Sequence, residues 1–193
     1  MNQLGRIHNF GAGPATLPLE VVEECQNSLP NLNASGFGLL EISHRSDTFQ
    51  KIIDSAMERL RRILSIPEDY TVLFLQGGAS LQFYMSALNL LKTGEKVDFL
   101  VTGAWSQKAM KEAMRIGDVS PRWDDSENGF TSIPKNGEYS IRDDAVYLHY
   151  TSNNTLYGTQ YHHLPENYGK PRVLDASSDI AGVPIDVSAH DLI

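Results

Sequence analysis

Short apolar runs alternate with longer amphipathic stretches along most of the chain, and this alternation constrains the fold more than any other feature. Apolar residues that recur every three or four positions predict a helix, whereas a short continuous apolar run predicts a buried strand. The predicted helices cover residues 16–30, 46–64, 81–91 and 105–116, and the predicted strands cover 70–75, 97–101, 119–123, 145–150 and 172–174. Such alternation predicts an α/β fold with a mainly parallel sheet and flanking helices.

The helix predicted over residues 46–64 is the most strongly patterned element. Ser46 or Asp47 can cap its N-terminus, because a short side chain with an oxygen accepts hydrogen bonds from first-turn N–H groups. Its apolar side chains share one face; they are Phe49, Ile52, Ile53, Ala56, Met57, Leu60, Ile63 and Leu64.

The helix predicted over residues 16–30 has Pro18 in its first turn, where a missing N–H costs nothing. It also carries Cys25, the only cysteine of the chain, in an apolar stripe with Val21, Val22 and Leu29. We therefore expect a buried thiol. A single cysteine excludes an internal disulfide and fits a reducing compartment, so the protein is predicted to be cytoplasmic.

The composition is that of a globular protein with an acidic surface. The chain has 193 residues, a net charge of -8 and 41% hydrophobic residues, enough for one sizeable domain. The excess of acid argues against nucleic-acid and anionic-membrane partners, although a local cationic pocket for a small anion stays open. No apolar run approaches the roughly 20 residues that a membrane span needs.

Parallel sheets bind ligands at the carboxyl ends of their strands. Four segments follow predicted strands: residues 76–80, 102–105, 151–155 and 175–179. In the first, Gly77 and Gly78 permit a tight turn into a helix whose first N–H groups can bind a phosphate dianion, with the Ser80 hydroxyl as a further donor. A plain strand-to-helix turn explains the same glycines equally well.

Two side chains of the other segments suit an aromatic cofactor. The Trp105 indole can lie flat against such a ring, although it also continues the apolar stripe of its own helix. Asp175 can hold a proton on a pyridine nitrogen and so make the ring an electron sink. The alternative for Asp175 is a turn aspartate that bonds to its own backbone.

His44 and Arg45 precede the helix over residues 46–64. An arginine fork suits carboxylate or phosphate, and a histidine adds a second donor. A solvated loop is the other interpretation of this pair. The histidines show no metal-ligand pattern, so no metal is predicted.

Six segments, in this order, resemble those of the phosphoserine aminotransferase family, which are class-V, fold type I enzymes dependent on pyridoxal 5'-phosphate. They are Asn9–Ala15, Glu41–Ser46, Gly77–Phe83, Thr102–Ser106, His149–Thr155 and Asp175–Asp186. The resemblance runs from about residue 9 to residue 193.

The resemblance implies the large domain of a fold type I aminotransferase. The implied reaction is transamination between glutamate and 3-phosphohydroxypyruvate, which gives phosphoserine and 2-oxoglutarate in serine biosynthesis. By the same resemblance, backbone groups of Ala79 and Ser80 bind the cofactor phosphate and Trp105 stacks on the ring. Thr155 bonds the ring oxygen and Asp175 the ring nitrogen. Some relatives have arginine at the position of Ser80, so this cup lacks that cation.

His44 and Arg45 are implied to meet the anionic substrate across a homodimer interface. The family's Schiff-base lysine is expected beyond Ile193, past a strand that residues 191–193 begin, so no catalytic residue is assigned within the chain. We expect an N-terminal arm over residues 1–15 and an incomplete large domain over 16–193, without the small C-terminal domain. Such a fragment is expected to be inactive by itself.

Two alternatives remain open. One keeps the fold and changes the substrate, as in an alanine–glyoxylate-type aminotransferase or a cysteine desulfurase. The other is a binding module without catalysis. The His44–Arg45 pair favours a phosphorylated substrate over the first alternative.

Overall fold

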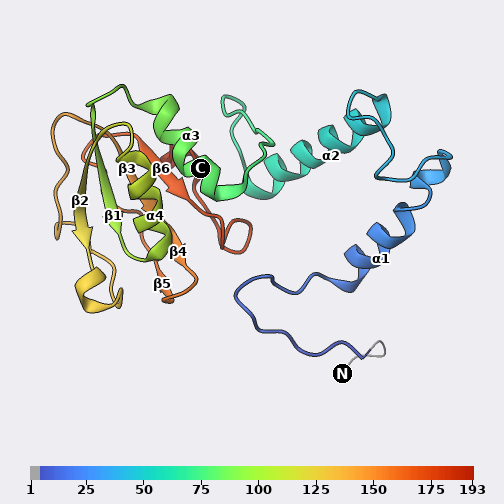
Figure 1. The fold of residues 1–193 in the computed structure, drawn as a ribbon, viewed down its shortest axis with the longest axis horizontal. Coiled ribbons are helices and arrows are strands. Elements are labelled where there is room, and N and C mark those ends of the chain that lie inside the picture. Colours follow the sequence, from blue (N-terminus) through green and yellow to red (C-terminus); the bar gives the residue numbers. More distant parts are fainter. Residues whose placement is uncertain (1–4) are drawn as a thin grey trace. The chain divides into compact units, whose positions relative to one another are not determined.

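The computed structural model describes residues 5–193, which form two compact units (Figure 1). The first unit ends at Leu60 and the second comprises Arg61–Ile193. The boundary falls inside a continuous helix, α2 (Asp47–Leu64).

The first unit contains the arm and the N-terminal helices. Its elements are α1 (Leu19–Ser28), a short 3-10 helix η1 (Leu32–Ala34) and most of α2. The prediction for α2 is confirmed: Ser46 Oγ accepts the Phe49 N–H at 3.2 Å and caps the helix. Pro18 precedes α1 as its N-cap residue and is not inside the first turn.

The expectation for Cys25 is wrong. Its thiol is exposed, and no side chain of α1 is buried. The apolar stripe was read correctly as a helical face, but periodicity shows only that a face is apolar. Whether another element covers that face depends on parts of the fold that the local pattern does not contain.

The second unit is built on a four-stranded sheet, as Figure 1 shows. Its strands run in the order β2-β1-β3-β6, and every neighbouring pair is parallel. This confirms the predicted α/β fold. The elements of the sheet layer are β1 (Lys96–Val101), β2 (Asp118–Asp124), β3 (Ala145–Thr151) and β6 (Arg172–Asp175), with α3 (Gly78–Leu90) and α4 (Ala104–Ala113) as connecting helices.

Shorter elements complete this unit. They are the antiparallel pair β4 (Asn153–Asn154) and β5 (Thr159–Gln160), and the 3-10 helices η2 (Ser126–Asn128) and η3 (Val187–Ala189). Leu192 bridges Val173 in parallel, so the chain returns beside β6 as a strand-like segment. This agrees with the expectation that residues 191–193 begin a strand.

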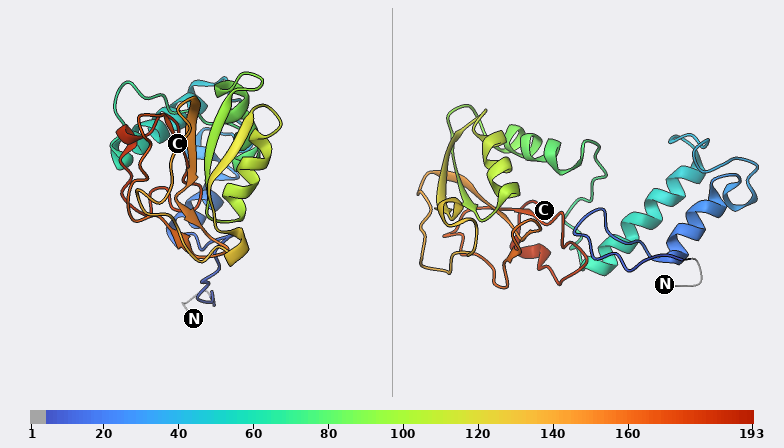
Figure 2. Two further views of the ribbon diagram at one scale, coloured as in Figure 1. Left: turned by 90° about the vertical axis from the view of Figure 1, so that its left-hand side faces the viewer. Right: turned by 60° about the horizontal axis from the view of Figure 1, so that its bottom comes forward.

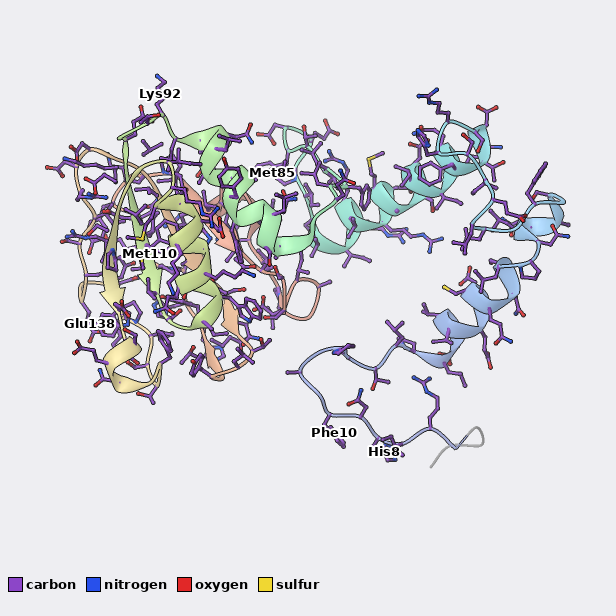
Figure 3. All side chains as sticks on the ribbon, viewed as in Figure 1. His8, Phe10, Met85, Lys92, Met110 and Glu138 are labelled. Atoms are coloured by element: carbon purple, nitrogen blue, oxygen red, sulfur yellow. The ribbon has the colours of Figure 1, made fainter. Side chains whose placement is uncertain are left out.

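The sheet is buried on both faces. One face packs against α3 and α4, where Phe83, Ala87 and Ala109 meet Phe99 and Tyr147 of the strands; Figure 2 shows these helices on one side of the sheet. Met110 of α4 packs at the edge of this core, whereas Lys92 beyond α3 projects into solvent (Figure 3).

The second face is covered by irregular segments. Tyr139 and Ile141 pack there with Leu148 and Leu174. Tyr139 and Ile141 belong to residues 124–144, a polar and turn-rich segment. This polar segment places its few apolar side chains on the sheet, and composition averaged over the segment hides them.

Residues 70–75 do not form the predicted strand. In the described chain they pair with no other strand, and Leu73, Phe74 and Leu75 are exposed. Strand-like composition creates a preference, but a strand exists only where a neighbour accepts its backbone hydrogen bonds.

Candidate active site

The N-terminus of α3 has no capping side chain among the described residues, so its first backbone N–H groups carry the partial positive charge of the helix dipole. Gly77 (φ 96°) and Gly78 (φ 60°) turn the chain into the helix through the left-handed region, which glycine tolerates best. A Cβ on Gly77 would lie 2.3 Å from Leu81 Cδ2. No side chain caps this end, and its first turn carries no acidic residue. The helix dipole and the first N–H groups, including those of Ala79 and Ser80, therefore favour an anion here.

A lysine that sequence reasoning did not select lies beside this helix start. Lys108 of α4 donates from Nζ to Ser80 Oγ at 2.6 Å. The same ammonium lies 5.7 Å from the centroid of the Trp105 ring, within range of a cation–π interaction. The spacing of three residues between Trp105 and Lys108 is the signal that could have found it, because it places both on one helix face.

Trp105 stands outside the core. It is 37% exposed and belongs to neither buried cluster, so the core-packing interpretation does not hold. Its Nε1–H donates to Thr155 Oγ1 at 3.1 Å. Two predicted site residues from different strand-end segments are thus in direct contact, and their bond fixes the plane of the indole.

Asn154 holds these two segments together. It is fully buried and donates from Nδ2 to Thr102 Oγ1 at 3.0 Å. The Thr159 hydroxyl donates to the Thr102 carbonyl at 2.8 Å, which ties the β4–β5 hairpin to the end of β1. The hairpin carries Thr155 and was not predicted, since two-residue strands leave no periodic signal.

Asp175 makes the contacts of a turn aspartate with one of its two carboxylate oxygens. Its Oδ1 accepts from Ser177 N–H at 3.1 Å and Ser177 Oγ at 2.6 Å, as a turn aspartate does. Its Oδ2 accepts only the Thr151 hydroxyl, at 3.3 Å. A carboxylate oxygen can accept two hydrogen bonds, so Oδ2 retains capacity for a further N–H donor. Its position at the end of β6 puts it on the edge of the sheet where ligands bind.

His149 lies two residues before Thr151 on β3 and was not selected from the sequence. Because β3 and β6 are in parallel register, His149 and Thr151 face the same side of the sheet as Asp175. Its ring stacks on Phe99 with centroids 4.6 Å apart, and its buried Nδ1 has no hydrogen-bond partner. Burial lowers the pKa of His149 to about 4, against an opposing effect of the Asp175 charge.

His44 and Arg45 belong to the first unit, in the turn that leads into α2. Both side chains are exposed. The Arg45 N–H donates to Ser43 Oγ at 3.2 Å, a local turn contact that leaves the guanidinium free of any carboxylate within the described chain.

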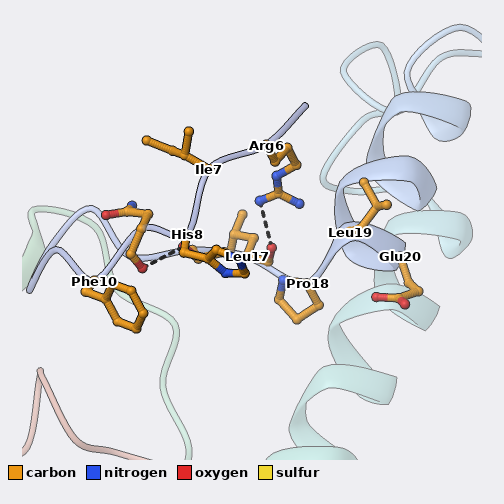
Figure 4. Close-up of a pocket in the computed structure, with 10 residues that line it drawn as sticks. Arg6, Ile7, His8, Phe10, Leu17, Pro18, Leu19 and Glu20 are labelled. Atoms are coloured by element: carbon orange, nitrogen blue, oxygen red, sulfur yellow. Dashed lines mark hydrogen bonds between the residues drawn. The ribbon is translucent and has the colours of Figure 1, made fainter. Parts of the chain in front are cut away.

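The arm forms a hollow of its own (Figure 4). The cavity, about 380 Å³, is lined by residues 6–10 and 16–20, and Arg6 bonds the Leu17 carbonyl at 3.1 Å across it. None of the predicted site residues lines it. Among the described residues, no helix is long and apolar enough to cross a membrane, and no cluster of three or more His, Cys, Asp or Glu side chains is arranged for a metal ion.

A parallel sheet with polar side chains at the carboxyl ends of its strands is an arrangement that binds ligands at that edge. The family model for class-V aminotransferases matches residues 7–192. The chain therefore belongs to the class-V aminotransferase family.

Among curated proteins, phosphoserine aminotransferases are similar over nearly the whole chain. That of Desulfotalea psychrophila is 45% identical and that of Bacillus cereus 46% identical, each over 188 residues and 97% of this chain. Both matches cover 52% of the relative. The chain thus spans about half the length of the curated relatives that it matches.

Solved structures of phosphoserine aminotransferases also match the chain. Phosphoserine aminotransferase from Bacillus circulans subsp. alkalophilus matches with a TM-score of 0.91 and 40% identity, over 96% of this chain and 51% of that one. The pyridoxal-phosphate-bound enzyme from Trichomonas vaginalis gives 0.86 and 34%, over 93% and 53%. An alanine–glyoxylate aminotransferase from Nostoc, with a TM-score of 0.66 and 16% identity over 97% and 50%, shares the fold alone. The fold is that of the fold type I aminotransferases, represented in part.

Proposed function

We propose that the chain is the cofactor-cradling part of a phosphoserine aminotransferase that uses pyridoxal 5'-phosphate. The observation that carries this proposal is the contact between Trp105 and Thr155 at the carboxyl edge of the sheet. It joins Trp105, which is predicted to stack on the cofactor ring, to the hydroxyl of Thr155, which is predicted to bond the ring oxygen.

The residues present fit this cofactor. The uncapped start of α3 suits its phosphate, the exposed face of Trp105 suits its ring, and Oδ2 of Asp175 has room for the ring N–H. Bound there, the cofactor supplies an electron sink for carbon–hydrogen bond cleavage at the substrate. The role of Asp175 is to keep the ring nitrogen protonated.

The Thr155 hydroxyl can donate a hydrogen bond. Its Oγ1 already accepts the Trp105 indole N–H, and a hydroxyl has one donor and two acceptor positions. The Thr155 O–H therefore remains available for the ring oxygen. The indole N–H is engaged by Thr155, so the contribution of Trp105 to ring binding would be stacking and not hydrogen bonding.

We assign His44 and Arg45 to the anionic substrate, which follows from their chemistry and from the resemblance of residues 41–46. We further propose a cytoplasmic homodimer. Support for a dimer comes from α1 and α2, which are amphipathic yet bury no side chain in the described chain. The organisation we propose is an arm over residues 1–15 followed by a large domain from residue 16, whose cofactor-binding lysine comes after residue 193.

Substrate preference in the full-length protein tests the function. We expect kcat/KM for phosphoserine to exceed that for serine by on the order of a hundredfold or more, because an arginine fork discriminates strongly for phosphate. Arg45→Ala should raise the KM for phosphoserine far more than the KM for glutamate, while Arg59→Ala, an exposed arginine of α2, serves as the matched control. Absence of phosphoserine turnover rejects the function, and equal effects on both substrates reject the assignment of Arg45.

A further inference from the structure

We propose that Lys108 is the cation of the phosphate site, and that its ammonium binds the cofactor phosphate together with the Ser80 hydroxyl and the N-terminus of α3. This rests on the proposed function and deepens it. The sequence left this cup without a cation because Ser80 stands where some relatives have arginine. The structure brings a cation to the same point from a different helix.

Lys108 places its ammonium at the positive end of α3. Its ammonium contacts a residue in the first turn of α3, where the helix dipole is positive and no acidic side chain is present. No carboxylate in residues 5–193 lies within 4.0 Å of Nζ. The ammonium and the positive start of α3 thus lie side by side with no carboxylate between them, an arrangement that an anion would stabilise.

The hydrogen-bond directions leave donors free for that anion. Ser80 Oγ accepts from Lys108, so the hydroxyl hydrogen points elsewhere and can be donated. The ammonium uses one of its three N–H groups on Ser80 and keeps two. The Trp105 ring beneath Nζ restricts where the ammonium can move and keeps it beside the ring on which the cofactor stacks.

The competing explanation is a tether that merely joins α3 to α4. A tether contributes to stability and is indifferent to the charge of a ligand. A phosphate ligand makes binding depend on the phosphate group. The two explanations therefore differ in how Lys108 affects ligands with and without phosphate.

The test compares pyridoxal 5'-phosphate, pyridoxal and inorganic phosphate as ligands of the full-length protein. Binding is followed by Trp fluorescence and by the shift of the thermal midpoint. Lys108→Met removes the charge and keeps the length of the side chain, and Lys108→Arg restores the charge. Lys111→Met, an exposed lysine one turn further along α4, is the matched control.

We expect Lys108→Met to weaken pyridoxal 5'-phosphate binding about tenfold to a hundredfold and to leave pyridoxal binding unchanged. Lys108→Arg should recover most of the loss, and Lys111→Met should show none. Equal weakening of both ligands, or no weakening, overturns the proposal. Should the wild type bind neither pyridoxal compound, the proposed function fails. In that case, midpoint stabilisation by inorganic phosphate that requires Lys108 supports the cation site, and stabilisation independent of Lys108 overturns it.

Discussion

His149 is a buried base whose Nδ1 has no hydrogen-bond partner among the described residues. Its Nδ1 is sealed between Phe99 and the overlying helix, where Phe83 contacts the ring edge-on. Burial holds the pKa of His149 near 4, although the charge of Asp175 opposes this. In a neutral state the ring fills space beside Asp175 without competing for its carboxylate, so Oδ2 keeps room for the N–H donor that we propose.

This burial predicts a pH dependence of stability. The unfolded histidine titrates near 6.5, so between about pH 6.5 and 4 the unfolded state binds more protons and stability falls as the pH falls. From pH 6.5 to pH 5 the loss from His149 is about 1.5 kcal/mol. His149→Phe, whose ring suits the Phe83–Phe99 surroundings, should lack this part of the loss in urea unfolding curves at the two pH values.

His162→Phe is the control, because His162 is exposed. It should keep the wild-type pH dependence. His190, whose pKa is also lowered, chiefly by burial, remains in all three proteins and contributes equally to each. A His149→Phe profile as steep as that of the wild type would show that His149 is not the titrating group.

For single residues, the sequence indicated which residue types stand at the strand ends but not which side chains surround them. Trp105 and Asp175 were selected because they follow strands and Thr155 through the family resemblance, and Trp105 and Thr155 are in contact. Lys108 and His149 were missed because their roles depend on which side chains surround them.

Among the elements, the junction of β1, α4 and the β4–β5 hairpin leaves no room for a side chain at Gly103. Gly103 has extended backbone geometry, which any residue adopts, so its requirement is one of space. A Cβ there would lie 2.2 Å from Asn154 Oδ1 and 2.7 Å from Asn154 Cβ. Asn154 cannot withdraw without losing its bond to Thr102.

Gly103→Ala should therefore displace the hairpin and separate Thr155 from Trp105. We expect a destabilisation of about 1–3 kcal/mol, typical of overpacking in a filled interior, and a shift of Trp fluorescence in the folded state. Gly13→Ala, at a position with nothing within 4 Å of the added Cβ, is the matched control. Unchanged stability and fluorescence in Gly103→Ala would show that the junction accommodates the added methyl group without displacing the hairpin.

Elements differ in how far they follow from sequence. The helices α2 and α4 and the buried strands β1 and β3 carry their periodicity locally, and each lies where it was predicted. Residues 70–75 have the same apolar character but no neighbouring strand in the described chain. Their state depends on pairing with a distant segment, which no local pattern specifies.

For the whole chain, the arrangement of lysines decides whether it can hold the cofactor covalently. The lysines are Lys51, Lys92, Lys96, Lys108, Lys111, Lys135 and Lys170. None follows β6, the strand that ends at Asp175. Lys96 pairs with Asp144 at 2.6 Å, and Lys170 donates to the Asp143 carbonyl. Lys96 begins β1 and Lys170 precedes β6, so both lie at the amino ends of the strands, whereas the candidate site lies at the carboxyl ends.

Lys108 alone among them stands in the site, and there it is placed for the phosphate and not for the aldehyde of the cofactor. A polypeptide of these 193 residues should therefore bind pyridoxal 5'-phosphate reversibly, show no transamination and, after borohydride reduction, carry label scattered in part over several lysines. Peptide mapping by mass spectrometry measures this. Stoichiometric label on one lysine, Lys108 included, would show that the aldehyde lies where we place the phosphate, and the orientation of the cofactor along α3 and α4 would have to be reversed.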